Sequence, residues 1–330
     1  MLKTAIISFE HMHAWGYASA LMESPLLEFT AYVEKDPERY EKIRKKFPSA
    51  KAYHSREQML ADGGFDAVIV TSANKSHKQD VLDAAAAGKH ALCEKPIATT
   101  VKSARAMIDS CKKAGVKIMT AFPVRYSPAV KRAAKILRSN SMGKILAVNA
   151  TNHGSMPGGW FVDKKLSGGG AIIDHTVHVA DLVRYLLSEE IVQVYAEKAS
   201  KLHNIKVEDC GLLMMQTSRG TFISLDASWS RPPSYKIWGD VTMKFKGEKA
   251  NLSVDCFPRT LNVYDNRTMH HDAVSEGENL DLMLVEDFAR SVLEDKPPFI
   301  SGEDGLKAME TALGAYRAIR EKQPVTLPLA

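Results

Sequence analysis

Three side chains in this sequence suit proton transfer at a hydroxyl group. Lys95 stands directly before Pro96, and Asp174 and His178 are four residues apart in a stretch with helical periodicity. Residues i and i+4 of a helix share one face. Imidazole titrates near neutral pH, whereas a lysine amine, with an ordinary pKa of about 10.4, must be brought down by burial or a nearby positive charge. We expect His178 to accept a hydroxyl proton, Lys95 to orient the reacting hydroxyl and share its proton, and Asp174 to fix the substrate or the imidazole.

The first part of the chain alternates between apolar runs and helix-prone segments. Strands are predicted at 4–9, 29–33, 65–71, 90–93 and 116–122, with helical segments between them, including 36–47, 76–87 and one that Thr100 caps and Gly115 ends. Strict alternation of this kind predicts a parallel, doubly wound sheet. We assign residues 1–122 to a Rossmann-type dinucleotide-binding domain.

The pattern changes after Arg125. Predicted helices at 128–138 and 174–187 flank a strand at 145–151 and are followed by strands without intervening helices at 192–199, 211–217, 221–227, 241–245, 251–254 and 260–264. Helices at 281–293 and 303–321 end the chain. Consecutive strands favour antiparallel pairing. The predicted fold class is therefore α/β, with an α+β domain over 123–330 that carries a large, mostly antiparallel sheet.

Composition narrows the possible partners and location. Lys and Arg number 44 against 39 Asp and Glu, a net charge of +5 that is too small and dispersed to indicate nucleic acid or an anionic membrane. No run approaches the roughly 20 apolar residues of a membrane helix, and the first strand begins near Met1, so we expect a cytoplasmic protein. The four cysteines lie far apart without a CxxC pair, which argues against a zinc knuckle or a disulfide framework.

Polar groups follow the predicted parallel strands, where an open sheet of this class binds its ligands. Glu34 lies about 25 residues after the first strand, near the place of the acid that binds the adenosine ribose in dinucleotide folds. A carboxylate there favours NAD, and the neighbouring Lys35 leaves NADP possible. The alternative is that Glu34 is a solvated surface acid.

Two long blocks resemble the Gfo/Idh/MocA oxidoreductases, the family of glucose–fructose oxidoreductase and inositol dehydrogenase. They are VIVTSANKSHKQDVLDAAAAGKHALCEKPIA at 68–98 and LSGGGAIIDHTVHVADLVRYLL at 166–187. The resemblance implies an NAD(P)-dependent oxidoreductase that moves a hydride between nicotinamide and a secondary hydroxyl of a sugar, polyol or sugar-derived substrate. It also implies a homodimer or homotetramer formed through the C-terminal sheet.

The resemblance assigns roles to individual residues. It implies that Glu94 and Lys95 meet the nicotinamide ribose, that Pro96 carries a cis peptide bond, and that Asp174 and His178 form the family's DxxxH pair. The residues it implies around the cofactor, besides Glu94, Lys95 and Pro96, are Thr71, Ser72, Asn74, His77 and Arg125.

The first loop departs from the family pattern. Glycines at GxGxxG normally let the backbone approach the pyrophosphate, but this chain reads Ser8-Phe9-Glu10-His11-Met12-His13. Glu10 would oppose a phosphate by roughly 1 to 4 kcal/mol, depending on the local dielectric. We favour a reshaped loop in which Ser8, His11 or His13 donates to the pyrophosphate. The alternatives are weak cofactor binding and a domain that has abandoned its cofactor.

We expect His153, Trp160 and His175 to line the substrate pocket. Trp160 offers a flat face to a sugar ring, although a buried core tryptophan is the competing interpretation. His175 and His178, with Asp174 and His153, could also hold a divalent ion. The family normally needs none, so we predict no bound metal.

Two other functions compete with a dehydrogenase. One is a redox-assisted lyase or glycoside hydrolase that retains NAD and regenerates it in each turnover. The other is a non-catalytic, sugar-binding regulatory relative.

Overall fold

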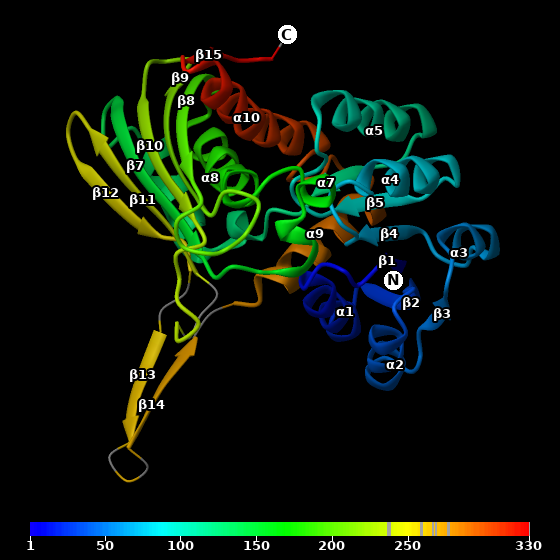
Figure 1. Cartoon of the computed structure of the whole chain (residues 1–330). Helices are drawn as coiled ribbons and strands as arrows, with labels where there is room; N and C mark the ends of the chain where they lie inside the picture. Colours follow the sequence, from blue (N-terminus) through cyan, green and yellow to red (C-terminus); the bar gives the residue numbers. More distant parts are fainter. Residues whose placement is uncertain (236–238, 258–259, 266, 268, 276–277, 330) are drawn as a thin grey trace. The chain divides into compact units, whose positions relative to one another are not determined.

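The computed structural model describes residues 1–235, 239–257, 260–265, 267, 269–275 and 278–329 (Figure 1). The chain divides into two compact units. The first comprises Met1–Pro123, Lys165–Gly168 and Asp281–Met309, and the second comprises Val124–Lys164, Gly169–Leu280 and Glu310–Ala330.

The first unit contains a six-stranded sheet in the order β3-β2-β1-β4-β5-β6, in which every pairing is parallel. Its strands are β1 Leu2–Ile7, β2 Leu27–Val33, β3 Lys51–Tyr53, β4 Ala67–Val70, β5 His90–Cys93 and β6 Ile118–Thr120. Its helices include α1 His13–Glu23, α2 Pro37–Lys46, α3 Arg56–Asp62, α4 His77–Ala86 and α5 Val101–Ala114. Every residue of β4 is buried, as expected for a strand covered on both faces. The predicted doubly wound fold is confirmed.

Local sequence signals predicted the ends of α5 correctly but missed two short elements. Thr100 accepts the backbone N–H of Ser103 at the start of α5, and Gly115 ends that helix in the left-handed conformation, both as predicted. The sequence did not predict β3 or α3. These elements have three and seven residues, too few for a periodic pattern to emerge.

The C-terminal helices contribute to the first unit as well. Helix α9 spans Leu280–Leu293 and α10 spans Gly302–Glu321. Met119 of β6 forms a bridge with Ser301, and a Cβ at Gly305 would overlap the Thr120 side chain. The start of α10 therefore packs directly against the edge strand of the parallel sheet.

The second unit contains a seven-stranded sheet in the order β12-β11-β7-β10-β9-β8-β15 (Figure 1). Its strands are β7 Ile145–Gly154, β8 Ile191–Ala199, β9 Cys210–Thr217, β10 Phe222–Ser228, β11 Gly239–Gly247, β12 Asn251–Asp255 and β15 Val325–Thr326. Only the β10–β7 pairing is parallel among these described strands, so the predicted mostly antiparallel sheet is confirmed. A separate hairpin joins β13 Thr260–Asp265 to β14 His270–Ser275.

The two faces of this sheet differ. Helix α8, Ala171–Leu187, packs on β7 and β10 and is buried along nearly its whole length, and α6, Pro128–Arg138, contacts α8. Side chains on the opposite face alternate with the core residues and include the exposed Leu212, Met214 and Phe222. In the described part of the chain, no helix combines the length and apolar character needed to cross a membrane.

Candidate active site

The loop after β1 is held by hydrogen bonds within the first unit. Ser8 adopts a left-handed φ of 72°, a conformation usually left to glycine, and its Oγ accepts the Glu10 backbone N–H at 3.1 Å. Thr71 Oγ1 donates to the Ser8 carbonyl at 2.7 Å, and the His11 N–H donates to the Thr71 carbonyl at 3.0 Å. The loop therefore keeps a tight turn without glycine by bonding to the end of β4.

Glu34 lies directly after β2 and is only 2% exposed, which excludes a solvated surface acid. Its carboxylate accepts the backbone N–H groups of Phe9 at 3.1 Å and of Lys35 and Asp36 at 2.8 Å. The Arg39 guanidinium bonds to both oxygens, at 3.0 and 3.1 Å. A ribose hydroxyl would have to share oxygens that already accept these donors.

A cavity of about 530 Å³ opens along this edge of the first unit. Its lining includes Ser8 but neither His11 nor His13 among the described residues. The charged side chains in its wall are Lys35, Arg39, Arg56, Lys75, Glu10, Glu34, Glu57 and Asp80. Of the three loop side chains predicted to meet the pyrophosphate, Ser8 alone lines this cavity.

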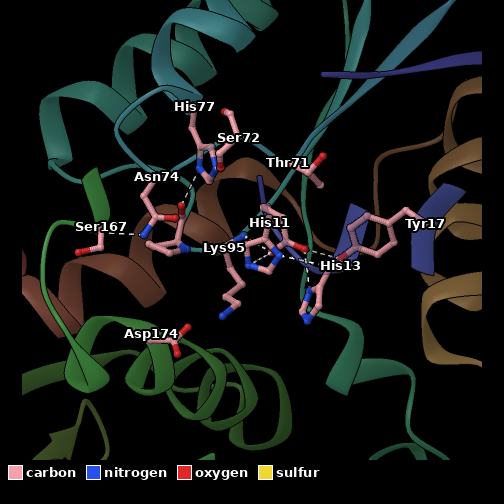
Figure 2. Close-up of polar contacts among 12 residues, drawn as sticks. His11, His13, Tyr17, Thr71, Ser72, Asn74, His77, Lys95, Ser167 and Asp174 are labelled. Atoms are coloured by element: carbon pink, nitrogen blue, oxygen red, sulfur yellow. Dashed lines mark hydrogen bonds and ion pairs between the residues drawn. The ribbon is translucent and has the colours of Figure 1, made fainter. Parts of the chain in front are cut away.

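His77 joins the turns that follow β4 and β5 (Figure 2). Its Nδ1 lies 3.0 Å from the Pro96 carbonyl and its Nε2 lies 2.9 Å from the Ser72 carbonyl, with the ring fully buried. Ser72 Oγ donates to Asp80 at 2.5 Å. These two predicted cofactor residues therefore also fix the positions of their neighbours.

Asn74 presents a buried acceptor at the same sheet edge. Its Nδ2 donates to the Ser167 carbonyl at 2.8 Å, as Figure 2 shows. Its Oδ1 is buried and has no hydrogen-bond partner within the described residues. Because an unsatisfied buried acceptor is unfavourable, this atom fits a donor on a bound ligand.

Lys95 lies in a buried turn after β5. The Lys95–Pro96 peptide is cis, as the resemblance implies, and the Lys95 side chain is 3% exposed. The Lys95 N–H donates to Glu94 Oε2 at 2.9 Å. This turn brings an amine to the carboxyl end of a central parallel strand.

Glu94 is fully buried and surrounded by donors, among them His11, His13 and Tyr17, which Figure 2 labels. Tyr17 Oη donates to its Oε1 at 2.6 Å, His13 Nδ1 lies 2.9 Å from the same oxygen, and His11 Nε2 lies 3.9 Å from Oε2. Burial alone would raise the pKa of Glu94, but the facing His11 and His13 hold it well below its usual range. The two loop histidines thus turn toward this carboxylate.

In the second unit, close packing at the start of α8 explains the glycine run before it. A Cβ at Gly169 would overlap the Tyr316 hydroxyl, and one at Gly170 would overlap the Glu208 carbonyl oxygen. Glu208 Oε1 accepts the Gly170 N–H at 2.7 Å and the Tyr316 hydroxyl at 2.5 Å. Sequence reasoning missed Glu208 and Tyr316 because neither belongs to a local motif.

The first turn of α8 carries Asp174 in a buried setting. Its Oδ2 accepts Trp229 Nε1 at 3.0 Å and lies 3.3 Å from His175 Nε2. His175 Nδ1 lies 2.7 Å from the Asn152 carbonyl, and His178 is 5% exposed. The helix starts three residues before the predicted boundary. Trp229 was not predicted, since a single tryptophan after a strand carries no signal of its own.

Trp160 packs in this same region. It stacks on Phe161, with ring centroids 3.9 Å apart, and contacts the hydrophobic cluster that contains Trp229. Trp160 is half-buried. Part of Trp160 therefore packs in a core, and part stays accessible to a sugar ring, so both interpretations of its sequence position apply.

His153 lies on the face of β7 opposite the one on which α8, the helix that carries His175, packs. It points to the sheet face opposite α8, with Nδ1 2.9 Å from Asp240 Oδ2 and Nε2 3.2 Å from Asp226 Oδ2. The reason is strand alternation, because the side chain of the neighbouring Asn152 is buried and consecutive side chains of a strand lie on opposite faces. These aspartates raise the pKa of His153 to about 9.

Arg125, expected near the cofactor, forms a buried ion pair within the second unit. Its Nε and Nη2 lie 2.7 and 2.5 Å from the two oxygens of Asp181 on α8. Its guanidinium also lies over the Tyr185 ring, 5.1 Å from the centroid. In this unit Arg125 anchors the segment before α6 to α8.

Both parts of the chain match known sequence families. Residues 4–122 match the oxidoreductase family with an NAD-binding Rossmann fold, and residues 130–253 match the C-terminal domain of GFO/IDH/MocA proteins.

Named relatives match over nearly the full length. Myo-inositol 2-dehydrogenase from Thermotoga maritima is 25% identical, covering 93% of this chain and 92% of its own. D-xylose 1-dehydrogenase (NADP(+)) 2 from Haloferax volcanii is 26% identical, covering 91% and 92%. The crystal structure of GenD2 from gentamicin A biosynthesis, in complex with NAD, has the same fold, with a TM-score of 0.91, 22% identity and coverage of 99% and 97%.

Proposed function

We propose that this chain, which belongs to the Gfo/Idh/MocA family of oxidoreductases and carries that family's NAD-binding Rossmann domain, oxidises a secondary hydroxyl of a sugar, polyol or sugar-derived substrate. The names of the relatives, which act on myo-inositol and D-xylose, support this substrate class. The observation that carries the proposal is the buried Lys95 in the turn at the carboxyl end of β5.

The first unit offers suitable contacts for a dinucleotide. Asn74 Oδ1 is a buried acceptor to which no described residue donates, so a donor on the ligand could bind it. Lys35 and Lys75 add positive charge to the cavity wall. Ser8 Oγ lies in that wall where the family has glycine. Bound NAD(P) supplies the nicotinamide carbon that accepts the hydride. The carboxylate of Glu34 disfavours a ribose phosphate, so we infer a preference for NAD.

We propose acid–base roles for individual side chains. We propose that His178, which is buried in α8, accepts the hydroxyl proton and that the Lys95 amine orients the reacting hydroxyl. Asp174 is held by Trp229 and faces His175, which supports a role in fixing the imidazole or binding a substrate hydroxyl. Trp160 and His175 are the proposed substrate-pocket residues. His153 is withdrawn from that pocket.

The proposal is tested by titrating NAD and NADP into the purified protein by calorimetry and then screening myo-inositol, D-xylose and related polyols for NADH formation. We expect saturable NAD binding, weaker NADP binding, and catalytic accumulation of NADH with at least one polyol. Absence of dinucleotide binding would refute the proposal and favour a sugar-binding regulatory protein. Substrate turnover without net NADH would favour the lyase or glycoside hydrolase with retained NAD.

We also infer a cytoplasmic homo-oligomer. The cysteines are free thiols, which suits a reducing compartment. Leu212, Met214 and Phe222 are 64%, 54% and 58% exposed on the open face of the seven-stranded sheet, an apolar surface that suits contact with a second copy. Light scattering measures the mass directly, and a strictly monomeric protein would contradict this inference.

A further inference from the structure

Three side chains with metal-binding atoms converge in the first unit. His11 comes from the loop after β1, His13 from the first residue of α1, and Glu94 from the residue after β5. One ligand atom of each lies within 4.8 Å of those of the other two. This is the only such group of three that the described residues contain.

The spacing is close to that of an occupied site. Three atoms no more than 4.8 Å apart have a common centre at most about 2.8 Å from each of them. Zinc bonds to imidazole nitrogen and carboxylate oxygen are about 2.0–2.2 Å long. Inward movements of less than about 1 Å, which side-chain rotation can supply, would complete the coordination.

We propose that His11, His13 and Glu94 bind one divalent transition-metal ion of the zinc class. Two imidazoles and one carboxylate are a ligand set that zinc and its neighbours accept, with a further position left open to water or another ligand. His13 is 32% exposed, so the ion can enter from solvent, whereas His11 and Glu94 are buried. The expectation of no bound metal came from the family resemblance, and this site draws on the loop that departs from the family.

The surroundings of Glu94 provide the second observation. Metal-binding carboxylates are usually oriented by outer hydrogen bonds. Tyr17 Oη holds one oxygen of Glu94 at 2.6 Å and the Lys95 N–H holds the other at 2.9 Å. A cation would also balance a carboxylate that is fully buried.

Metal binding moves protons in this cluster. His11 Nδ1 accepts the His13 backbone N–H at 3.1 Å, so the neutral ring carries its proton on Nε2, the nitrogen that faces Glu94. Ligation through Nε2 moves that proton to Nδ1, so the hydrogen bond that Nδ1 accepts from the His13 backbone N–H must break. Ligation of His13 through Nδ1 likewise leaves its proton on Nε2.

The test uses full-length, tag-free protein treated with a chelator and kept free of dinucleotide. ZnCl2 is titrated by calorimetry, and CoCl2 by its visible absorption. We expect one ion per chain. His13→Gln keeps a donor toward Glu94 but removes the ring, and should weaken binding by more than the roughly 10- to 100-fold expected for the outer-partner variant Tyr17→Phe. His54→Ala, an exposed histidine elsewhere in the unit, should bind as the unmodified protein does.

Two results would overturn the proposal, namely no stoichiometric uptake by the unmodified protein, or uptake that His13→Gln leaves unchanged. If His13→Gln does not fold, His11→Gln and the cobalt spectrum of the unmodified protein apply the same test. A parallel NAD titration separates this proposal from the proposed function. Protein that binds NAD but no zinc refutes only the metal site, and the reverse result refutes only the cofactor.

Discussion

Replacing His153 with Gln should make the free energy of unfolding of the second unit change less when the pH rises from 7 to 10. His153 lies between Asp226 and Asp240 on the open sheet face, with its side chain 19% exposed. Hydrogen bonds that the ring donates to both carboxylates raise its pKa from 6.5 to about 9. Because the folded pKa is the higher one, the stabilisation is fully present below pH 6.5 and is lost as pH rises through 9.

The size of this effect follows from the two pKa values. Each unit of difference corresponds to about 1.36 kcal/mol, so the rise from 6.5 to about 9 gives an upper limit of about 3 kcal/mol. Asp226 is 45% exposed, and solvent screens its share of the interaction. We therefore expect the unmodified protein to lose about 2 kcal/mol between pH 7 and pH 10 through this group.

The assay is urea unfolding at matched protein concentration, followed at pH 7 and pH 10 for the unmodified protein and His153→Gln. Other groups titrate in both proteins, so their contributions cancel in the difference. The stability gap should be about 2 kcal/mol at pH 7 and should nearly close at pH 10. A gap that stays constant across this range would refute the argument that His153 is held protonated by its two aspartates.

The remaining predictions concern packing around α8. Gly170→Ala should destabilise the protein by about 1–3 kcal/mol, because the new Cβ would overlap the Glu208 carbonyl; an unchanged urea midpoint would contradict this. Arg125→Met should cost about 3–5 kcal/mol by removing the guanidinium that both oxygens of the buried Asp181 contact, and adding Asp181→Leu should restore most of the loss. A double variant no more stable than Arg125→Met alone would show that the ion pair is not the cause.

The sequence predicted the parts of the site that local patterns encode. Alternation of apolar and helical segments located β1, β4 and β5, and the rule for parallel sheets placed Thr71 and Lys95 at their carboxyl ends. Helical spacing put Asp174 and His178 on one buried helix.

The parts it missed depend on contacts between distant segments. Glu208 and Tyr316 meet Gly170 from positions far along the chain, and nothing near either residue signals that contact. The side of the strand on which His153 falls depends on strand register, which the consecutive polar residues Thr151, Asn152 and His153 do not fix. Likewise, the loss of glycine from the first loop was visible, but not that Ser8 would adopt the left-handed turn in its place.

The central claim is that Lys95 acts beside a bound dinucleotide. The most direct test compares Lys95→Ala with Lys102→Ala, an exposed lysine on α5, in steady-state oxidation of the best polyol from the screen. We predict that Lys95→Ala lowers kcat by about 10²- to 10⁴-fold, with the protein still folded at the temperature of the assay, as Lys102→Ala is. A kcat for Lys95→Ala within a few-fold of the control would contradict the account.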